Sequence, residues 1–227
     1  MMSATSLPVI LFIGVNPTDT RRLRLDDEAK RIKQALRDRK DQLTFVSEGA
    51  VTADALRQHL LEHNPRVVHM SGHALTAGFK FENPQGTTAL IRTDSLVDLF
   101  KLCGASTQCV VLNACLSADL AEALCPHIPY VIGMREQIGD EAALEFTSGF
   151  YDALARDCTY KDAYLIGRNA IDLKDIPESL GPVLKVRPGT PELRLFEGTR
   201  ADLLLTQYRQ FVLRDLAVPG EGASFLP

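Results

Sequence analysis

The 227-residue chain lacks the features that mark several large classes of protein. No apolar run approaches the roughly 20 residues of a membrane-spanning helix, and the N-terminus has no basic region followed by a long apolar stretch. There is no glycine-rich phosphate loop of the Walker or Rossmann type, no internal repeat and no low-complexity tract. We therefore expect a cytoplasmic protein that has no contact with membranes and needs no cofactor.

Positive charge is also scarce, because the net charge is −4. Such a balance argues against direct binding of nucleic acid. Residues 21–40 do hold nine Lys and Arg against four Asp and Glu. This excess could mark a phosphate-contacting or partner-docking face. No aromatic residues are interleaved for base stacking, so the segment reads better as a solvated helix face.

The cysteines are odd in number and form no CxxC pair, which favours reduced thiols over a disulfide framework. They are Cys103, Cys109, Cys115, Cys125 and Cys158. We expect four of them to be small hydrophobic residues of the core. Cys115 differs because its neighbours are polar and turn-like.

Short apolar runs rich in β-branched residues alternate with segments of helical spacing. Runs without polar alternation predict strands buried on both faces, and parallel strands need crossover helices. We therefore predict an α/β fold with a mostly parallel central sheet of about six strands flanked by helices. The predicted strands are 7–15, 43–46, 67–71, 109–112, 130–134 and 183–186, with a hairpin over 79–81 and 88–91. The predicted helices start near 26, at the cap Thr52, at a cap Thr93 or Asp94, and at 118, 140, 160 and 199.

Length favours one domain over residues 1–217, followed by a flexible tail over 218–227.

Two predicted strands end in residues able to carry chemistry. The run ending at Leu112 leads through Asn113 to Cys115, close to the start of a helix, where backbone N–H groups favour a thiolate. The strand 67–71 leads to His73. A Cys and a His at neighbouring strand ends supply the nucleophile and proton carrier of thiol hydrolysis.

The residues around this pair resemble a known family. The segments 69–74 (His-Met-Ser-Gly-His-Ala) and 112–117 (Leu-Asn-Ala-Cys-Leu-Ser) are similar to the CHAT branch of the caspase-like cysteine peptidases, related to caspases and separases. The resemblance runs in order over roughly residues 8–190. Its further segments are 10–13, 16–17, 22–28, 131–134, 140–143 and 150–151.

This resemblance implies a caspase-like three-layer sandwich and a cysteine endopeptidase with Cys115 as nucleophile and His73 as proton carrier. The oxyanion would be held by the backbone N–H groups of Cys115 and Ala74. The family usually has Gly at the position of Ala74. If that position requires a positive φ, Ala would cost of order 1 kcal/mol.

The resemblance also implies residues that bind the substrate. Asn113 occupies the position of a caspase Gln that lines the pocket for the residue before the cut. Asp140 matches an acid that receives an Arg or Lys side chain, although it would equally serve as the N-cap of the following helix. Glu136 is a weaker second acid in the same loop. We therefore expect a protein substrate to be cleaved after a basic residue.

Family members usually act in bacterial defence or programmed death, so we expect an activating or regulatory protein partner. Two other functions stay open: an impaired docking module with the same fold, and a small-molecule sensor on a flavodoxin-like fold. Three further histidines are assigned no catalytic role. His69 reads as structural, while His59 and His63 have metal-ligand spacing but no recognised third ligand, so no metal is predicted.

Overall fold

The computed structural model describes residues 7–196, of which Leu7–Leu195 form one compact unit. The predicted single domain over 1–217 extends past this range. The predicted helix at 199–216 and the predicted tail at 218–227 lie outside the described residues.

The central sheet has six strands in the order β2-β1-β3-β7-β8-β9. The first five are parallel to one another, and β9 runs antiparallel to β8. The predicted mostly parallel sheet of about six strands is thus confirmed. The strands are β1 (Val9–Gly14), β2 (Thr44–Gly49), β3 (Val67–Ser71), β7 (Cys109–Asn113), β8 (Tyr130–Met134) and β9 (Pro182–Val186).

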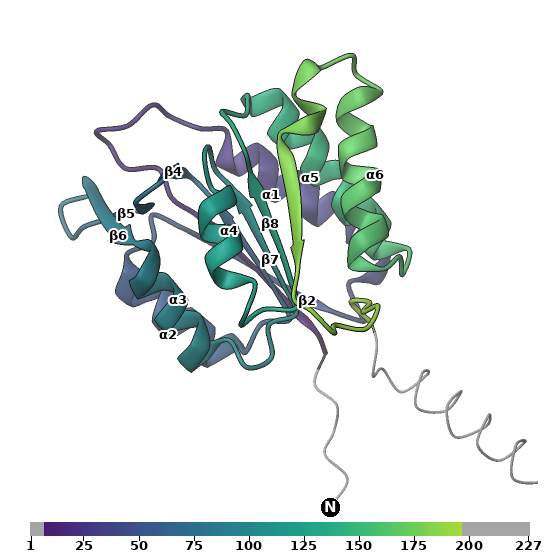
Figure 1. The fold of residues 1–227 in the computed structure, drawn as a ribbon, viewed down its shortest axis with the longest axis horizontal. Helices are drawn as coiled ribbons and strands as arrows, with labels where there is room; N and C mark the ends of the chain where they lie inside the picture. The colour runs from purple at the N-terminus through teal and green to yellow at the C-terminus, as the bar shows by residue number, and fades with distance from the viewer. Residues whose placement is uncertain (1–6, 197–227) are drawn as a thin grey trace, which may run out of the picture. The chain divides into compact units, whose positions relative to one another are not determined.

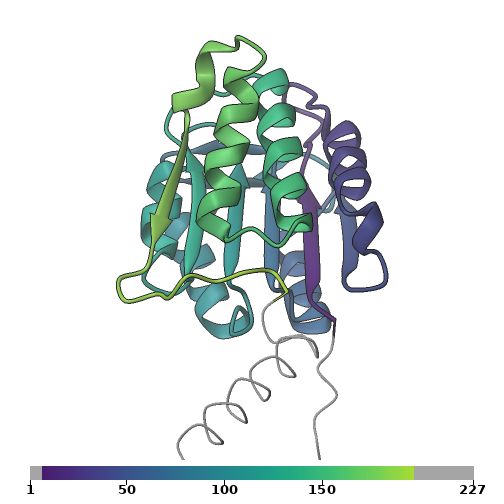
Figure 2. The same cartoon turned by 90° about the vertical axis from the view of Figure 1, so that its right-hand side faces the viewer.

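Helices cover both faces of this sheet, as the two views in Figures 1 and 2 show. On one face lie α1 (Leu25–Ala35), α5 (Asp140–Ala155) and α6 (Tyr160–Asp172), and on the other α2 (Ala53–His63), α3 (Thr93–Cys103) and α4 (Ala118–Leu124). The described range also contains two short 3₁₀ turns, η1 (Arg37–Arg39) and η2 (Pro177–Leu180). Because both faces are covered, every residue of β3, β7 and β8 is buried.

A second, three-stranded antiparallel sheet branches from the end of β3. It contains β4 (His73–Leu75), β5 (Gly78–Glu82) and β6 (Thr88–Arg92). The predicted hairpin is therefore present, with β4 as an added strand. Gly78 permits the close pairing of β5 with β6, because a Cβ there would lie 2.0 Å from the carbonyl oxygen of Ile91.

The helix starts differ from prediction at two places. Thr52 caps α2 as predicted, since its hydroxyl accepts a hydrogen bond from the N–H of Ala55 at 3.2 Å. However, Arg92 rather than Thr93 or Asp94 is the N-cap of α3. Gly139 is the N-cap of α5, so the prediction that Asp140 caps this helix is wrong. Asp140 is instead the first helical residue, and its carboxylate does not cap the helix.

The burial of the cysteines agrees only in part with the prediction from the sequence. None of the five cysteines is paired, and Cys109 is fully buried, but Cys103, Cys125 and Cys158 are only half-buried. The prediction of four core thiols therefore holds fully for Cys109 alone.

Within the described range 7–196, no helix has the length and apolar character needed to cross a membrane.

Candidate active site

His73 and Cys115 follow the ends of two neighbouring parallel strands at the same offset. In the register of β3 and β7, Ser71 lies opposite Asn113. His73 comes two residues after Ser71, and Cys115 two residues after Asn113. Paired strands lie about 4.8 Å apart, so the chain delivers both residues to one short stretch of the sheet's carboxyl edge.

Both residues line one cavity at that edge, with a volume of about 510 Å³. Asp140 lines it as well, together with Arg21, Ile138 and Glu178. The structure thus brings together four residues that the sequence singled out from three different segments: His73, Asn113, Cys115 and Asp140. Clefts beyond the carboxyl ends of parallel strands are the usual place for chemistry in such sheets.

The imidazole of His73 is oriented by the main chain of another loop. Its Nε2 lies 2.8 Å from the carbonyl oxygen of Arg21. A carbonyl can only accept, so Nε2 carries the hydrogen and donates it. In the neutral ring this leaves the lone pair on Nδ1. The loop is itself clamped by Asn16, whose side chain accepts from the N–H of Leu23 at 3.2 Å and donates to its carbonyl at 3.3 Å.

Gly72 lets the chain pass from β3 into β4 with His73 in this place. A Cβ at position 72 would lie 3.0 Å from the carbonyl oxygen of Val15 and 3.1 Å from the ring of Phe79. A side chain here would push a backbone carbonyl and a fully buried ring aside by a few tenths of an ångström, so this close approach favours glycine. The sequence Ser-Gly-His therefore has a steric reason beside its resemblance to a family motif.

Cys115 sits on a turn that Ser117 ties to both neighbouring strands. The buried hydroxyl of Ser117 donates to the carbonyl of Leu112 and accepts from the N–H of Met134, each at 2.9 Å. Between them, Leu116 has a positive φ of 55°, an uncommon conformation that costs a branched side chain about 1–3 kcal/mol. The half-buried Cys115 Sγ lies 4.0 Å from the carbonyl oxygen of Ile138.

Of the two acids that the sequence favoured, Asp140 lines the cavity and Glu136 does not. Asp140 is part-buried, with 27% of its side chain exposed, and its carboxylate lies 3.9 Å from the guanidinium of Arg21. Glu136 is exposed and lies outside this cavity; its main-chain carbonyl, not its carboxylate, contacts the turn of Cys115 by accepting from Leu116 at 3.4 Å. Glu178 of η2 lines the cavity instead. Besides Asp140 and the buried Glu28, the cavity therefore has an acid from a distant segment of the chain.

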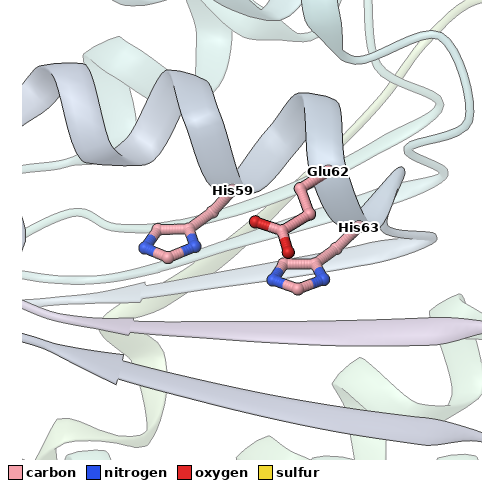
Figure 3. A group of neighbouring side chains, drawn as sticks. All are labelled: His59, Glu62 and His63. Carbon is pink, nitrogen blue, oxygen red and sulfur yellow. The ribbon is translucent and has the colours of Figure 1, made fainter.

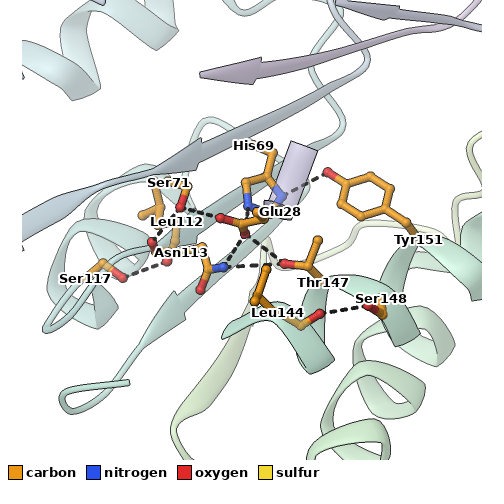
Figure 4. Close-up of polar contacts among 10 residues, drawn as sticks. All are labelled: Glu28, His69, Ser71, Leu112, Asn113, Ser117, Leu144, Thr147, Ser148 and Tyr151. Carbon is orange, nitrogen blue, oxygen red and sulfur yellow. Dashed lines mark hydrogen bonds and ion pairs between the residues drawn. The ribbon is translucent and has the colours of Figure 1, made fainter. Parts of the chain in front are cut away.

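Asn113 lines the cavity and also belongs to a buried polar network (Figure 4). Its amide donates to the carboxylate of Glu28, and only 4% of the residue is exposed. Glu28 also accepts from Ser71 at 2.6 Å and from Thr147 at 2.8 Å, and contacts Nε2 of His69 at 2.9 Å. Only the amide nitrogen is used in this way, because Oδ1 of Asn113 has no hydrogen-bond partner. The predicted contact between Asn113 and a substrate stays a prediction, and it could be made through this oxygen without breaking the bond to Glu28. In this structure Asn113 joins β7 to α1.

The network holds an ionised carboxylate away from water. Burial alone would raise the pKa of Glu28, but the charge of His69 and hydrogen bonds from His69, Ser71 and Asn113 outweigh it and lower this pKa below its usual 4.5. Nδ1 of His69 contacts the hydroxyl of Tyr151 at 3.0 Å. Burial, with Cys109 and Glu28 nearby, raises the pKa of Tyr151 well above 10. His69 is fully buried here, in keeping with the structural role predicted for it.

Ala74 lies in β4 with its side chain buried among core residues. It is absent from the described non-glycine residues with positive φ, so the strain considered for an Ala at this position does not arise. Gly72 and His73 line the cavity, whereas Ala74 is not among its lining residues. The assignment of the Ala74 and Cys115 N–H groups as oxyanion donors stays a prediction.

Sequence reasoning missed three residues that shape this site. Glu28 was visible only as an acid in the first turn of a helix, and Ser117 only as the last letter of a motif. Arg21 contributes through its carbonyl, which no side-chain pattern reveals. Asn16 gave a signal, because Asn-Pro after a buried strand indicates a turn at the carboxyl edge of the sheet.

Residues 9–165, more than half of the chain, match the CHAT domain family. The chain belongs to the CHAT domain family. This CHAT chain is 24% identical over 178 residues to a Roc-COR-CHAT protease of an unknown prokaryotic organism, a match covering 74% of the chain and 17% of that protein. It is 25% identical over 160 residues to a probable protease of Gillisia limnaea, covering 68% of the chain and 28% of that protein.

Solved structures share the fold of the CHAT chain at low sequence identity. The Arg-specific cysteine proteinase gingipain R aligns with a TM-score of 0.62 and 13% identity, over 84% of this chain and 48% of that one. The Drosophila initiator caspase Dronc aligns with a TM-score of 0.55 and 12% identity, over 84% of each chain. These likenesses confirm the predicted caspase-like fold. The chain spans less than a third of the length of either relative above.

Proposed function

We propose that this CHAT chain is a cysteine endopeptidase that works through Cys115 and His73. The observation that carries the proposal is their shared cavity, reached from equal offsets beyond two paired parallel strands. A thiol and an imidazole at one open edge are the minimum needed to cleave an amide by covalent catalysis. Membership of a family of caspase-like cysteine peptidases supports the same chemistry.

In this mechanism the thiolate sulfur of Cys115 attacks the carbonyl carbon of the scissile peptide. His73 holds the thiol proton and passes it to the leaving nitrogen as the C–N bond breaks, which leaves a thioester on the sulfur. A water molecule then attacks the carbonyl carbon of the thioester, and His73 takes the proton of that water. The C–S bond breaks, which releases the peptide's new carboxylic acid and restores the Cys115 thiolate. The Arg21 carbonyl fixes the ring through Nε2–H, so Nδ1 is the nitrogen that moves the proton.

The residue before the cut is, in this proposal, Arg or Lys. Asp140 offers a part-buried carboxylate at the cavity, and it already lies 3.9 Å from the Arg21 guanidinium of the same chain. That contact supports the idea that a guanidinium fits beside it. Glu178, also at the cavity, adds a second negative group. Gingipain R, a neighbour in fold, is described as Arg-specific.

We further propose that hydrolysis serves a defence or programmed-death response and is switched by a protein partner. The support is the family resemblance, and the fact that the chain matches only 17% and 28% of its two larger relatives. Arg21 offers a physical route for such a switch. Its loop touches both His73 and Asp140, so displacement of the loop would change the base and the proposed specificity group together.

Cleavage-site mapping in a cell lysate tests the proposed function. The wild type, Cys115→Ala and His73→Ala are compared, and new N-termini are identified by mass spectrometry. We expect cuts after Arg or Lys that depend on both residues. Cuts that persist in Cys115→Ala would contradict the mechanism. If all three proteins leave the lysate uncut after addition of candidate partners, the docking-module alternative is favoured; ligand-induced thermal shift without hydrolysis would favour the sensor.

A further inference from the structure

A cluster of metal-ligating side chains lies on α2, on a part of the molecule that the proposed catalysis does not use. His59 and His63 are one helical turn apart and therefore lie on one face of the helix. Their rings are parallel within 7°, with centroids 5.8 Å apart. The carboxylate of Glu62 lies beside the two rings, as Figure 3 shows. One ligand atom from each residue lies within 4.8 Å of the others.

The ligand types are those of a zinc site. Two imidazoles and one carboxylate, with a fourth position left for water, form a common tetrahedral zinc arrangement. Bonds of about 2.0–2.1 Å at tetrahedral angles need ligand atoms about 3.3 Å apart. The ligand atoms, which lie within 4.8 Å of one another, must therefore draw together by up to about 1.5 Å. Glu62 is exposed and His63 only half-buried, so side-chain rotation can supply this movement.

An unpaired atom points to a missing ligand at the same place. Nδ1 of His59 is buried, yet it has no hydrogen-bond partner. Buried polar atoms are nearly always paired, and an unsatisfied one calls for an ion or a water. The other groups of the cluster are an anion and a second imidazole, which suit a cation better than a lone water.

The helix holds this cluster rigidly and with favourable charge. Leu56 and Leu60 are fully buried and fasten the inner face of α2 to the core. His63 is the last helical residue before the left-handed cap Asn64. The C-terminal turn of a helix carries partial negative charge, which favours a bound cation. A site on a packed helix needs less ordering when the metal binds than one on a loop.

We propose that His59, Glu62 and His63 bind one zinc ion. The two imidazoles donate nitrogen ligands, the Glu62 carboxylate donates one oxygen, and water takes the remaining position. The last two residues of α2 lead through Asn64 and Pro65 into the amino end of β3, whereas the cavity with Cys115 and His73 lies beyond its carboxyl end. Zinc binding at α2 is therefore separable from peptide hydrolysis.

Zinc titration calorimetry on the full chain tests this site. The proteins are the wild type, the double variant His59→Gln/His63→Gln, Glu62→Gln, and the control His127→Gln on another part of the surface. Zinc that binds to free cysteines appears equally in all four. We expect one equivalent to be lost in the double variant and kept in the control. Glu62→Gln should bind at least about tenfold more weakly, since even outer-shell changes cost that much.

A second readout guards against misfolding of the double variant. Its melting temperature without metal should match that of the wild type, and zinc should raise the melting temperature of the wild type and control only. Cobalt bound in place of zinc should give a tetrahedral absorption spectrum without a thiolate charge-transfer band. The same stoichiometry in the wild type and the double variant would overturn the proposal. Unchanged affinity in Glu62→Gln would overturn the three-ligand site.

Discussion

Nε2 of His73 donates a hydrogen bond to the main-chain carbonyl of Arg21, 2.8 Å away. The carbonyl stands where many hydrolases have a third side chain that orients the base. Its position depends on a loop that Asn16 clamps through both polar groups of Leu23. The orientation of the His73 ring therefore depends on Asn16, a residue that does not line the cavity shared by His73 and Cys115.

Replacing Asn16 by Ala should loosen the loop and misorient His73. We expect kcat on a peptide substrate to fall about 10- to 100-fold, because small misplacements of a catalytic group cost that much. The KM for substrates with Arg before the cut should change as well, because the same loop carries Arg21, whose guanidinium lies 3.9 Å from the carboxylate of Asp140. Steady-state kinetics on Asn16→Ala, with the exposed loop variant Arg22→Ala as a control, measures this. Equal kcat values for the two variants would show that the clamp does not matter.

The second prediction concerns the ion pair between Arg21 and Asp140. Removing the Arg21 side chain in Arg21→Ala keeps the carbonyl that holds His73 but frees Asp140 from its ion pair at 3.9 Å. Exposed pairs contribute at most about 1 kcal/mol, so the KM for substrates with Arg before the cut should fall no more than about fivefold. Asp140→Asn should raise that KM about 10- to 100-fold, by loss of a charge-assisted contact. Substrates with Leu or Asp before the cut should show neither change, and a clear preference for Asp would end the basic-residue proposal.

Glu28 gives a prediction on stability. Its carboxylate links α1 to β3, β7 and α5 through buried partners (Figure 4). Glu28→Gln leaves His69 facing an amide and should lower the free energy of unfolding by about 3 kcal/mol, the usual cost of breaking a buried pair. The exposed neighbour Asp26, changed to Asn, should lie within about 0.5 kcal/mol of the wild type. Urea unfolding of the three proteins compares them, and a small loss in Glu28→Gln would mean that the network contributes little.

The same carboxylate predicts how stability depends on pH. The pKa of Glu28 is lower in the folded chain than its ordinary value of 4.5. The unfolded chain therefore takes up the proton first as the pH falls. The contribution of Glu28 is fully present above about pH 4.5 and is lost as the pH falls through the folded pKa. Unfolding free energies between about pH 7 and pH 3 should decline more steeply for the wild type than for Glu28→Gln. Parallel curves would contradict the lowered pKa.

The strands, and the placement of His73 and Cys115 at one edge of the sheet, could be predicted from sequence because their signals are local. A strand buried on both faces, such as β7, shows an unbroken apolar run, and the change to polar residues at Asn113 marks its carboxyl end. Since parallel strands end at one edge, His73 and Cys115 had to lie near each other once β3 and β7 were paired. The resemblance to CHAT domains then supplied their roles.

Other features depend on contacts between distant segments. Glu28 looks like a solvated acid in a helix start, and only the packing of α1 against the sheet buries it. Glu178 lies 42 residues after Glu136 and reaches the cavity through η2, which no local pattern indicates. Gly139, with an extended backbone at ψ 154°, is the N-cap of α5, whereas the sequence favoured its neighbour Asp140 for that position. Glu62 was overlooked beside His59 and His63 because it joins them only through side-chain placement.

The most direct test of the account is covalent labelling of Cys115. A peptidyl acyloxymethyl ketone with Arg before the reactive group is incubated with the wild type, Cys115→Ala and His73→Ala, and the label is located by peptide mass spectrometry. We expect the wild type to be labelled at Cys115 alone, His73→Ala to be labelled at least about a hundredfold more slowly, and Cys115→Ala to stay unlabelled. Equal labelling of Cys103, Cys125 or Cys158, or an unchanged rate in His73→Ala, would contradict a catalytic pair at this cavity.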